Sequence, residues 1–192
     1  MNERKGDRLD KIVTRGGDRG ETSLGDGSRV AKTDPRVALM GEVDELNSWI
    51  GVVLSHEPGP ECAETLHGVQ HDLFDLGGAL CFPGAPVLSA AHVARLDERA
   101  AALNASLAPL KEFVLPGGAP VVAWLHVART ACRRTERAAC GFLDGAAPDN
   151  FGVMYLNRLS DFLFIAARAE AARLGAPEIL WRKAYSVAGA DE

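Results

Sequence analysis

Apolar residues recur every three or four positions along five stretches of the chain, and this spacing predicts five amphipathic helices. The first is expected to begin at Pro35, with Asp34 as its N-cap, and to end before Pro58. The others are expected at about 62–80, 89–107, 120–143 and 150–174. No alternating apolar and polar run is long enough to demand a sheet. The expected fold class is therefore all-α, a five-helix bundle.

Composition indicates one globular domain. The chain has 192 residues, of which 47% are hydrophobic and 24% are charged, and these proportions exclude a disordered protein. A net charge of -5 gives no reason to expect nucleic acid or an anionic membrane as a partner. No segment resembles a bilayer span or a signal peptide, so we expect no membrane partner and a cytoplasmic location.

The domain itself is expected over residues 11–181, between a flexible tail at 1–10 and a C-terminal tail at 182–192. Its first part, residues 11–33, is rich in Gly, Asp, Ser and Thr. This composition predicts a structured loop without helix or strand.

Cysteine and histidine residues show no strong metal-site spacing. The four cysteines lack a C-x-x-C pair and are interpreted as small buried hydrophobes: Cys62, Cys81, Cys132 and Cys140. His67 and His71 stand four residues apart with Asp75 one turn further on, a spacing that can ligate a metal. The general-base Glu of the zincin motif is missing, and structural hydrogen bonding is the preferred interpretation. We expect no metal site built from side chains.

Three arginines form a stripe on the helix expected at 120–143. Arg129, Arg133 and Arg137 are spaced four residues apart, with Glu136 beside them. Three like charges repel one another, and Glu136 offsets only part of that repulsion. An anion bound to the stripe would relieve it. The alternative is a solvated helix face with a local ion pair.

Two further segments carry polar residues that can bind a ligand. Asn157, Asp161, Phe164 and Arg168 share one stripe of the helix expected at 150–174, which is either a binding surface or a polar bundle edge. The segment TRGGDRGETSLGDG (14–27) puts glycines beside hydroxyl and basic side chains, as an anion-binding loop would. It matches neither the P-loop nor the dinucleotide fingerprint, and an ordinary loop has a similar composition.

Taken together, six ordered blocks resemble the PduO-type ATP:cob(I)alamin adenosyltransferases, over about Ile12 to Trp181. They are TRGGDRGETSLGDGSRVAKTDPRV, GEVDELNSWIG, VQHDLFDLGGAL, FVLPGG, HVARTACRRTER and YLNRLSDFLF. The resemblance implies a five-helix bundle that assembles as a homotrimer with active sites between subunits. It also implies a transferase that moves the 5′-deoxyadenosyl group of ATP to the cobalt of cob(I)alamin, forming adenosylcobalamin and releasing triphosphate.

The resemblance also implies the site residues. The loop residues expected to contact ATP are Thr14, Arg15, Gly16, Gly17, Thr22, Ser23 and Lys32. The expected helical contacts, with Arg133 and Arg137 facing the phosphates, are Arg133, Arg134, Thr135, Glu136, Arg137 and Asn157. Asp44 and Arg129 correspond to an intersubunit salt bridge beside the corrinoid, and Phe113 and Phe164 to aromatic residues on the corrinoid side. Gly16 departs from the family's usual threonine, and Arg15 stands where lysine is common.

In the family reaction, reduced cobalt attacks the 5′ carbon of ATP. Arginines, loop donors and Mg²⁺ would stabilise the departing triphosphate. The cobalt supplies the nucleophile, so the catalytic residues expected are those that position and neutralise: Arg133, Arg137, Asp44, Arg129 and Phe113. Phe113 corresponds to an apolar wedge that displaces the lower axial base of cob(II)alamin. A reductase is an expected partner, and an adenosylcobalamin-dependent mutase is the acceptor considered for the product.

Two other classes of function remain as rivals. The chain could carry adenosylcobalamin without efficient catalysis, or it could be a structural helical oligomer with an incidental arginine stripe. Conversion of cob(I)alamin separates the enzyme from a carrier, and nucleotide binding excludes the structural oligomer.

Overall fold

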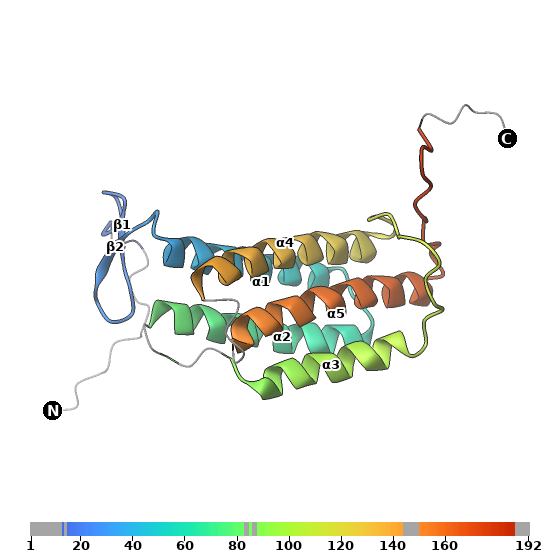
Figure 1. Cartoon of the computed structure of the whole chain (residues 1–192), viewed down its shortest axis with the longest axis horizontal. Helices are drawn as coiled ribbons and strands as arrows, with labels where there is room; N and C mark the ends of the chain where they lie inside the picture. Colours follow the sequence, from blue (N-terminus) through green and yellow to red (C-terminus); the bar gives the residue numbers. More distant parts are fainter. Residues whose placement is uncertain (1–12, 14, 83–84, 86–87, 144–149, 187–192) are drawn as a thin grey trace.

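The computed structural model describes residues 13, 15–82, 85, 88–143 and 150–186. Over these ranges five helices form an elongated bundle, and a short β-hairpin lies at the end where α1 begins (Figure 1). The elements are β1 (Glu21–Ser23), β2 (Arg29–Ala31), α1 (Pro35–Ser55), α2 (Pro60–Cys81), α3 (Ala90–Asn104), α4 (Pro120–Phe142) and α5 (Phe151–Arg173). The expected all-α five-helix bundle is confirmed.

Helix starts lie where the capping signals indicate. The Asp34 carboxylate accepts the backbone N–H of Arg36 at 2.8 Å, and Pro35 occupies the first helical position of α1. Ser89 caps α3, where its backbone N–H donates to Nδ1 of His92 at 3.2 Å. Local hydrogen bonding at these two positions fixes the boundaries that the sequence predicts.

The expectation of no strand in residues 11–33 is wrong. β1 and β2 pair antiparallel, with Thr22 opposite Val30. Gly27, at φ 84°, allows the turn between them, and the N–H of Gly25 donates to the carbonyl of Cys81 at 2.9 Å. Each strand has only three residues, too few to show an alternating pattern. The hairpin is thereby attached to the end of α2.

Two smaller expectations also need correction. α3 ends at Asn104, before Leu107, whose N–H instead bonds the carbonyl of Asn104 at 3.1 Å in a tight turn. Cys62 and Cys132 are buried as expected, but Cys81 is only half-buried and Cys140 is exposed, because it lies on the solvent side of α4. Burial raises the pKa of the Cys62 thiol to about 12, so this cysteine is an inert core residue.

α5 is the central helix of the bundle and packs against both α3 and α4, while α1 packs against α4 and α2. Tyr155, Leu156, Phe162 and Leu163 of α5 are fully buried and point to different sides of the helix. A helix that is apolar on most of its surface needs neighbours around it. The bundle is organised around α5 for this reason.

A buried polar group ties three helices together. Asp72 of α2 accepts a hydrogen bond from the Tyr155 hydroxyl of α5 at 2.6 Å and an ion pair from Arg95 of α3. Burial, together with the Asp72 charge, raises the pKa of Tyr155 well above its ordinary value, so the hydroxyl stays a donor.

No helix in the described ranges is long and apolar enough to cross a bilayer.

Candidate functional site

The N-terminal loop folds back on the hairpin and presents a lysine against its own backbone. A Cβ added to Gly17 would lie 3.0 Å from Nζ of Lys32 and 3.3 Å from the carbonyl oxygen of Glu21. The backbone N–H of Lys32 also donates to the carbonyl of Gly20 at 2.8 Å. A side chain at position 17 would therefore crowd the Lys32 ammonium where it approaches the loop.

Arg29 holds this loop in place, and the sequence did not single it out. Its guanidinium donates to the carbonyl of Gly16 at 2.9 Å and to Oγ of Ser23 at 3.2 Å, and it lies 3.4 Å from Glu21. The signal for Arg29 is its place opposite Ser23 in the hairpin, which is visible only once the hairpin is known.

The other expected loop residues lie around this core. Arg15 is exposed and has a left-handed backbone, with φ 57°, where the chain bends. Thr22 is half-buried on β1. Thr14 lies outside the described residues. The structure thus brings Gly16, Gly17, Ser23 and Lys32 together in one basic loop.

Arg133 and Arg137 are exposed on α4, and no ion pair joins either of them to an acidic residue within the described part of the chain. Arg137 donates to the backbone carbonyl of Arg133 at 3.0 Å. Glu136 forms no ion pair with either arginine, and its carboxylate accepts the Asn157 side-chain amide of α5 at 2.9 Å. Two positive charges are left facing outward, which is the arrangement an anion would neutralise.

Arg134 and Thr135 point toward α1. The Arg134 guanidinium forms an ion pair with Glu42 at 2.5 Å and a second one with Glu45. The Thr135 hydroxyl is fully buried, 3.1 Å from the carbonyl of Glu42. Within this chain these two residues fasten α4 to α1, and so determine the direction in which Arg133 and Arg137 project.

A second region of the site is largely apolar. Phe113, Phe164 and Arg129 line one cavity of about 510 Å³, together with Lys111 and Glu112. The Phe113 ring is 77% exposed, whereas Phe164 is half-buried under the Arg129 guanidinium, 5.9 Å from the ring centre. The structure therefore brings together three of the residues expected beside a corrinoid.

Arg129 has unused hydrogen-bonding capacity in this cavity. Its Nε is buried and has no hydrogen-bond partner among the residues that the structure describes. Burial, and to a smaller extent the neighbouring charge of Arg133, lower the pKa of Arg129. The Arg129 guanidinium is half-buried and forms no ion pair among the described residues, so an acidic group from outside the chain would stabilise it.

Asp44 does not supply that partner within the chain. It is exposed on α1 and lines a separate groove of about 550 Å³ between α1 and α2. The same groove carries Phe74, whose side chain is 72% exposed. Among the residues that the structure describes, no ion pair joins Asp44 to Arg129.

The expected stripe on α5 does not act as one surface. Asn157 binds Glu136, and Asp161 lies 3.6 Å from Arg158. Phe164 lines the cavity, while Arg168 is buried and pairs with Glu178. Only the first and third of the four residues lie at the regions described above.

No group of three or more His, Cys, Asp or Glu side chains that could hold a metal ion occurs in the described ranges. His67, His71 and Asp75 are all exposed on α2.

Comparison with known proteins places these features in a family. The family model for cobalamin adenosyltransferase matches residues 12–170. A cobalamin adenosyltransferase of Cupriavidus metallidurans is 49% identical over 180 residues, 93% of this chain and 97% of that protein. The corrinoid adenosyltransferase of Mycobacterium tuberculosis is 43% identical over 185 residues, covering 91% of this chain and 94% of its own.

Solved structures of cobalamin-binding relatives have a similar fold. A PduO-type ATP:corrinoid adenosyltransferase from Lactobacillus reuteri, a phenylalanine-to-alanine variant complexed with cobalamin and ATP, superimposes with a TM-score of 0.80 at 35% identity. The match covers 90% of this chain and 99% of that one. An arginine-to-lysine variant of the same type, complexed with ATP, gives 0.79 at 36% identity, over 89% of this chain and 100% of that one. Because sequence and fold agree over nearly the whole length, the chain belongs to the cobalamin adenosyltransferase family.

Proposed function

We propose that this protein is an ATP:cob(I)alamin adenosyltransferase, which transfers the 5′-deoxyadenosyl group of ATP to the cobalt of cob(I)alamin. The observation that carries the proposal is the agreement, along nearly the whole chain, with relatives named cobalamin or corrinoid adenosyltransferases. The two regions of the site supply what the reaction requires, a basic surface for a triphosphate and an apolar cavity beside it for a large ring system.

ATP is held by the basic loop and the exposed face of α4. Arg133 and Arg137 neutralise the phosphates, and Lys32 adds a third positive charge from the hairpin. The remaining contacts come from Thr14, Arg15, Gly16, Gly17, Thr22, Ser23, Arg134, Thr135, Glu136 and Asn157. Gly16 and Gly17 would contact ATP through backbone groups. Glu136 orients the Asn157 amide. Mg²⁺ accompanying ATP would be bound mainly by phosphate oxygens, as is usual for this ion.

The corrinoid lies against Phe113 and Phe164, with Arg129 beside it. Asp44 of a second copy supplies the acid that Arg129 lacks, so the active site lies between subunits of a homotrimer. This arrangement is supported by the unpartnered Nε of Arg129 and by the exposure of Asp44 in its apolar groove. Asp44 and Arg129 thus connect assembly to catalysis.

The reaction needs no protein nucleophile. The electron pair of cobalt(I) forms the bond to the 5′ carbon, the bond between that carbon and the phosphate oxygen breaks, and triphosphate leaves with the electron pair. Arg133 and Arg137 stabilise the charge that grows on the leaving oxygen. The apolar residues exclude water and hold the cobalt in line with the 5′ carbon. A reductase would deliver the electron, and a mutase that depends on adenosylcobalamin would take the product.

A visible absorbance assay tests this proposal. Purified protein is mixed with ATP, Mg²⁺ and chemically reduced cob(I)alamin, and loss of the reduced corrin band is followed. Formation of light-sensitive adenosylcobalamin with release of triphosphate is the expected result. Tight binding of both ligands without conversion would instead favour a carrier, and absence of any binding would contradict the proposal.

A further inference from the structure

Phe113 lies in a segment that cannot position it alone. Residues 105–119 connect α3 to α4 without a helix, and the Phe113 ring is 77% exposed, so packing within the chain does not fix the ring. A flat ligand pressed against one aromatic ring requires that ring at a defined height. The backbone that carries Phe113 must therefore be held by something outside its own segment.

A later segment of the chain supplies that support. The N–H of Trp181 donates to the carbonyl of Phe113 at 2.8 Å, and the N–H of Leu115 donates to the carbonyl of Ile179 at 2.8 Å. Between these bonds Val114 and Leu180 form an antiparallel bridge. Two short backbone bonds on either side of the bridge fix the strand direction, and hence the side of the segment on which Phe113 projects.

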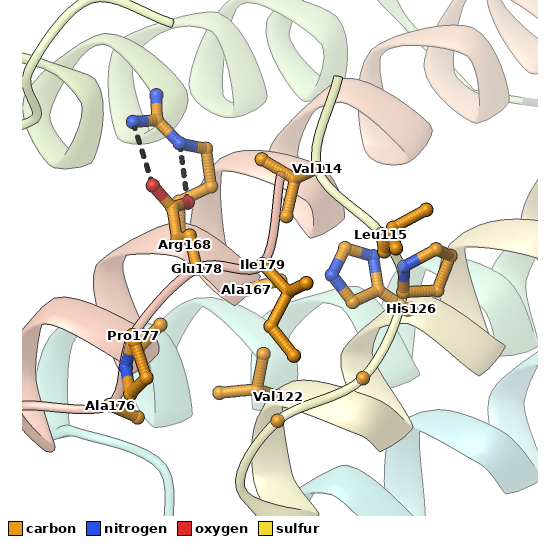
Figure 2. A pocket seen from close by; sticks show the side chains of 14 residues that line it. Val114, Leu115, Val122, His126, Ala167, Arg168, Ala176, Pro177, Glu178 and Ile179 are labelled. Carbon is orange, nitrogen blue, oxygen red and sulfur yellow. Dashed lines mark hydrogen bonds and ion pairs between the residues drawn. The ribbon is translucent and has the colours of Figure 1, made fainter. Parts of the chain in front are cut away.

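A buried arginine anchors both partners of this pairing. Arg168 of α5 is only 8% exposed, and its Nε donates to Glu178 at 2.8 Å. The same guanidinium donates to the carbonyl of Ala108 at 2.9 Å. The Arg168 side chain therefore bonds both to the segment that precedes Phe113 and to the segment that pairs with Val114. Figure 2 shows the two bonds between Arg168 and Glu178, and the segment that carries Val114.

The pairing between the Phe113 segment and the Trp181 segment lies over a cavity and not over close-packed side chains. Val114, Leu115 and Ile179 line a cavity of about 190 Å³, which His126 and Val122 also line (Figure 2). Atoms that face a cavity lose part of their dispersion contacts. The backbone bonds and the Arg168–Glu178 ion pair must consequently supply much of the positioning.

We propose that the segment Ala176–Trp181 is a positioning element for Phe113, and that Arg168 and Glu178 are its positioning residues. The inference rests on the proposed function in one respect only, that Phe113 faces the corrinoid. The segment need not touch the substrate itself.

Two variants at one position separate the backbone bond from the side chain. Trp181→Pro removes the N–H that bonds Phe113, whereas Trp181→Ala keeps it and removes the indole. We expect Trp181→Pro to lower kcat with the corrinoid by about 10-fold, and Trp181→Ala by no more than about 3-fold, because small misplacements next to a reacting centre have large effects. KM for ATP should stay unchanged in both. Equal losses in the two variants would overturn the proposal.

A background lacking the ring tests whether the segment acts through Phe113. In Phe113→Ala, Trp181→Pro should cause no further loss, since the group to be positioned is gone. A loss of the same size in both backgrounds would show a general structural role and overturn the inference. Glu178→Gln, which keeps the side-chain shape, should give a smaller loss with the same dependence on Phe113.

Two readouts keep this test separate from the proposed function. The visible spectrum of bound cob(II)alamin should change with Trp181→Pro but not with Trp181→Ala, while thermal melting shows that both variants are folded. If wild-type protein converts no cob(I)alamin, the proposed function fails. If it converts cob(I)alamin but the two Trp181 variants are alike, only the positioning inference fails.

Discussion

The two halves of the site are built in opposite ways. Around the basic loop and α4, the charged groups are exposed and Arg133 and Arg137 have no acidic partner among the described residues. Around Phe113, the ring is apolar and its backbone is held by bonds to a distant segment. Charge attracts a phosphate over several ångströms and tolerates some freedom in the side chain. An apolar contact is short-ranged and non-directional, so its geometry must come from elsewhere in the chain.

The largest expected effect comes from removing the unpaired charge. Replacing both Arg133 and Arg137 by alanine should lower kcat/KM for ATP by roughly 10²–10⁴-fold, since each hydrogen bond to a charged group contributes about 1.5–3 kcal/mol. Corrinoid affinity, measured by titration, should change little. Arg99→Ala is the matched control, because Arg99 forms an exposed ion pair with Glu64. A parallel fall in corrinoid affinity would mean that the two halves are not separate.

A charge exchange tests whether the halves meet between subunits. Asp44→Arg and Arg129→Asp should each lower turnover by roughly 30-fold, because each leaves a charge facing its like at the interface. The double variant should recover part of the activity, and mixing the two single variants should not do so unless subunits exchange. Turnover and sedimentation are the measurements. Failure of the double variant to improve on either single one would argue against this pair.

A single methyl group should disturb the basic loop. Gly17→Ala places a Cβ at 3.0 Å from Nζ of Lys32 and must displace that side chain. KM for ATP is expected to rise about 5- to 10-fold, corresponding to roughly 1–1.4 kcal/mol. Gly141→Ala is the control, since nothing lies within 4 Å of its added Cβ. An unchanged KM would show that Lys32 does not contribute to the phosphate site.

The smallest effect is a pH dependence of stability on the apolar side. His126 is buried, and burial, followed by the charge of Arg129, lowers its pKa from the ordinary value of 6.5. The unfolded chain therefore takes up a proton near pH 6.5 while the folded chain resists it, and stability falls as pH drops below that value. The slope is at most about 1.4 kcal/mol per pH unit.

His126→Gln removes the titrating group at this position. Thermal melting between pH 7.5 and about 5.5 should show a smaller loss of stability in the variant than in the wild type. An identical pH profile in the two proteins would assign the acid sensitivity to other groups.

The sequence predicted the helices because their signals are local. Asp34 and Pro35 mark the start of α1, and the spacing of leucines marks the buried face of α5. What it missed depends on pairing between distant segments. The contacts of Arg29 can be recognised only once β1 is known to pair with β2. Glu136 was placed beside the arginines of α4, whereas its carboxylate accepts a hydrogen bond from Asn157 of α5. The Arg168–Glu178 anchor was hidden for the same reason.

The pairing of Val114 with Leu180 also has a consequence for the order of folding. The hairpin strands, and the helix pairs α1 with α2 and α4 with α5, contact partners that are next to them in sequence, and such contacts form quickly. The bridge joins positions on either side of α4 and α5, and closing so long a loop is slow until those helices have docked. Once α4 and α5 have docked, the bundle and its phosphate-facing arginines can be complete before Leu180 pairs with Val114. The positioning of Phe113 is then the last step of folding, and the chain acquires its basic surface before it acquires the support for its aromatic ring.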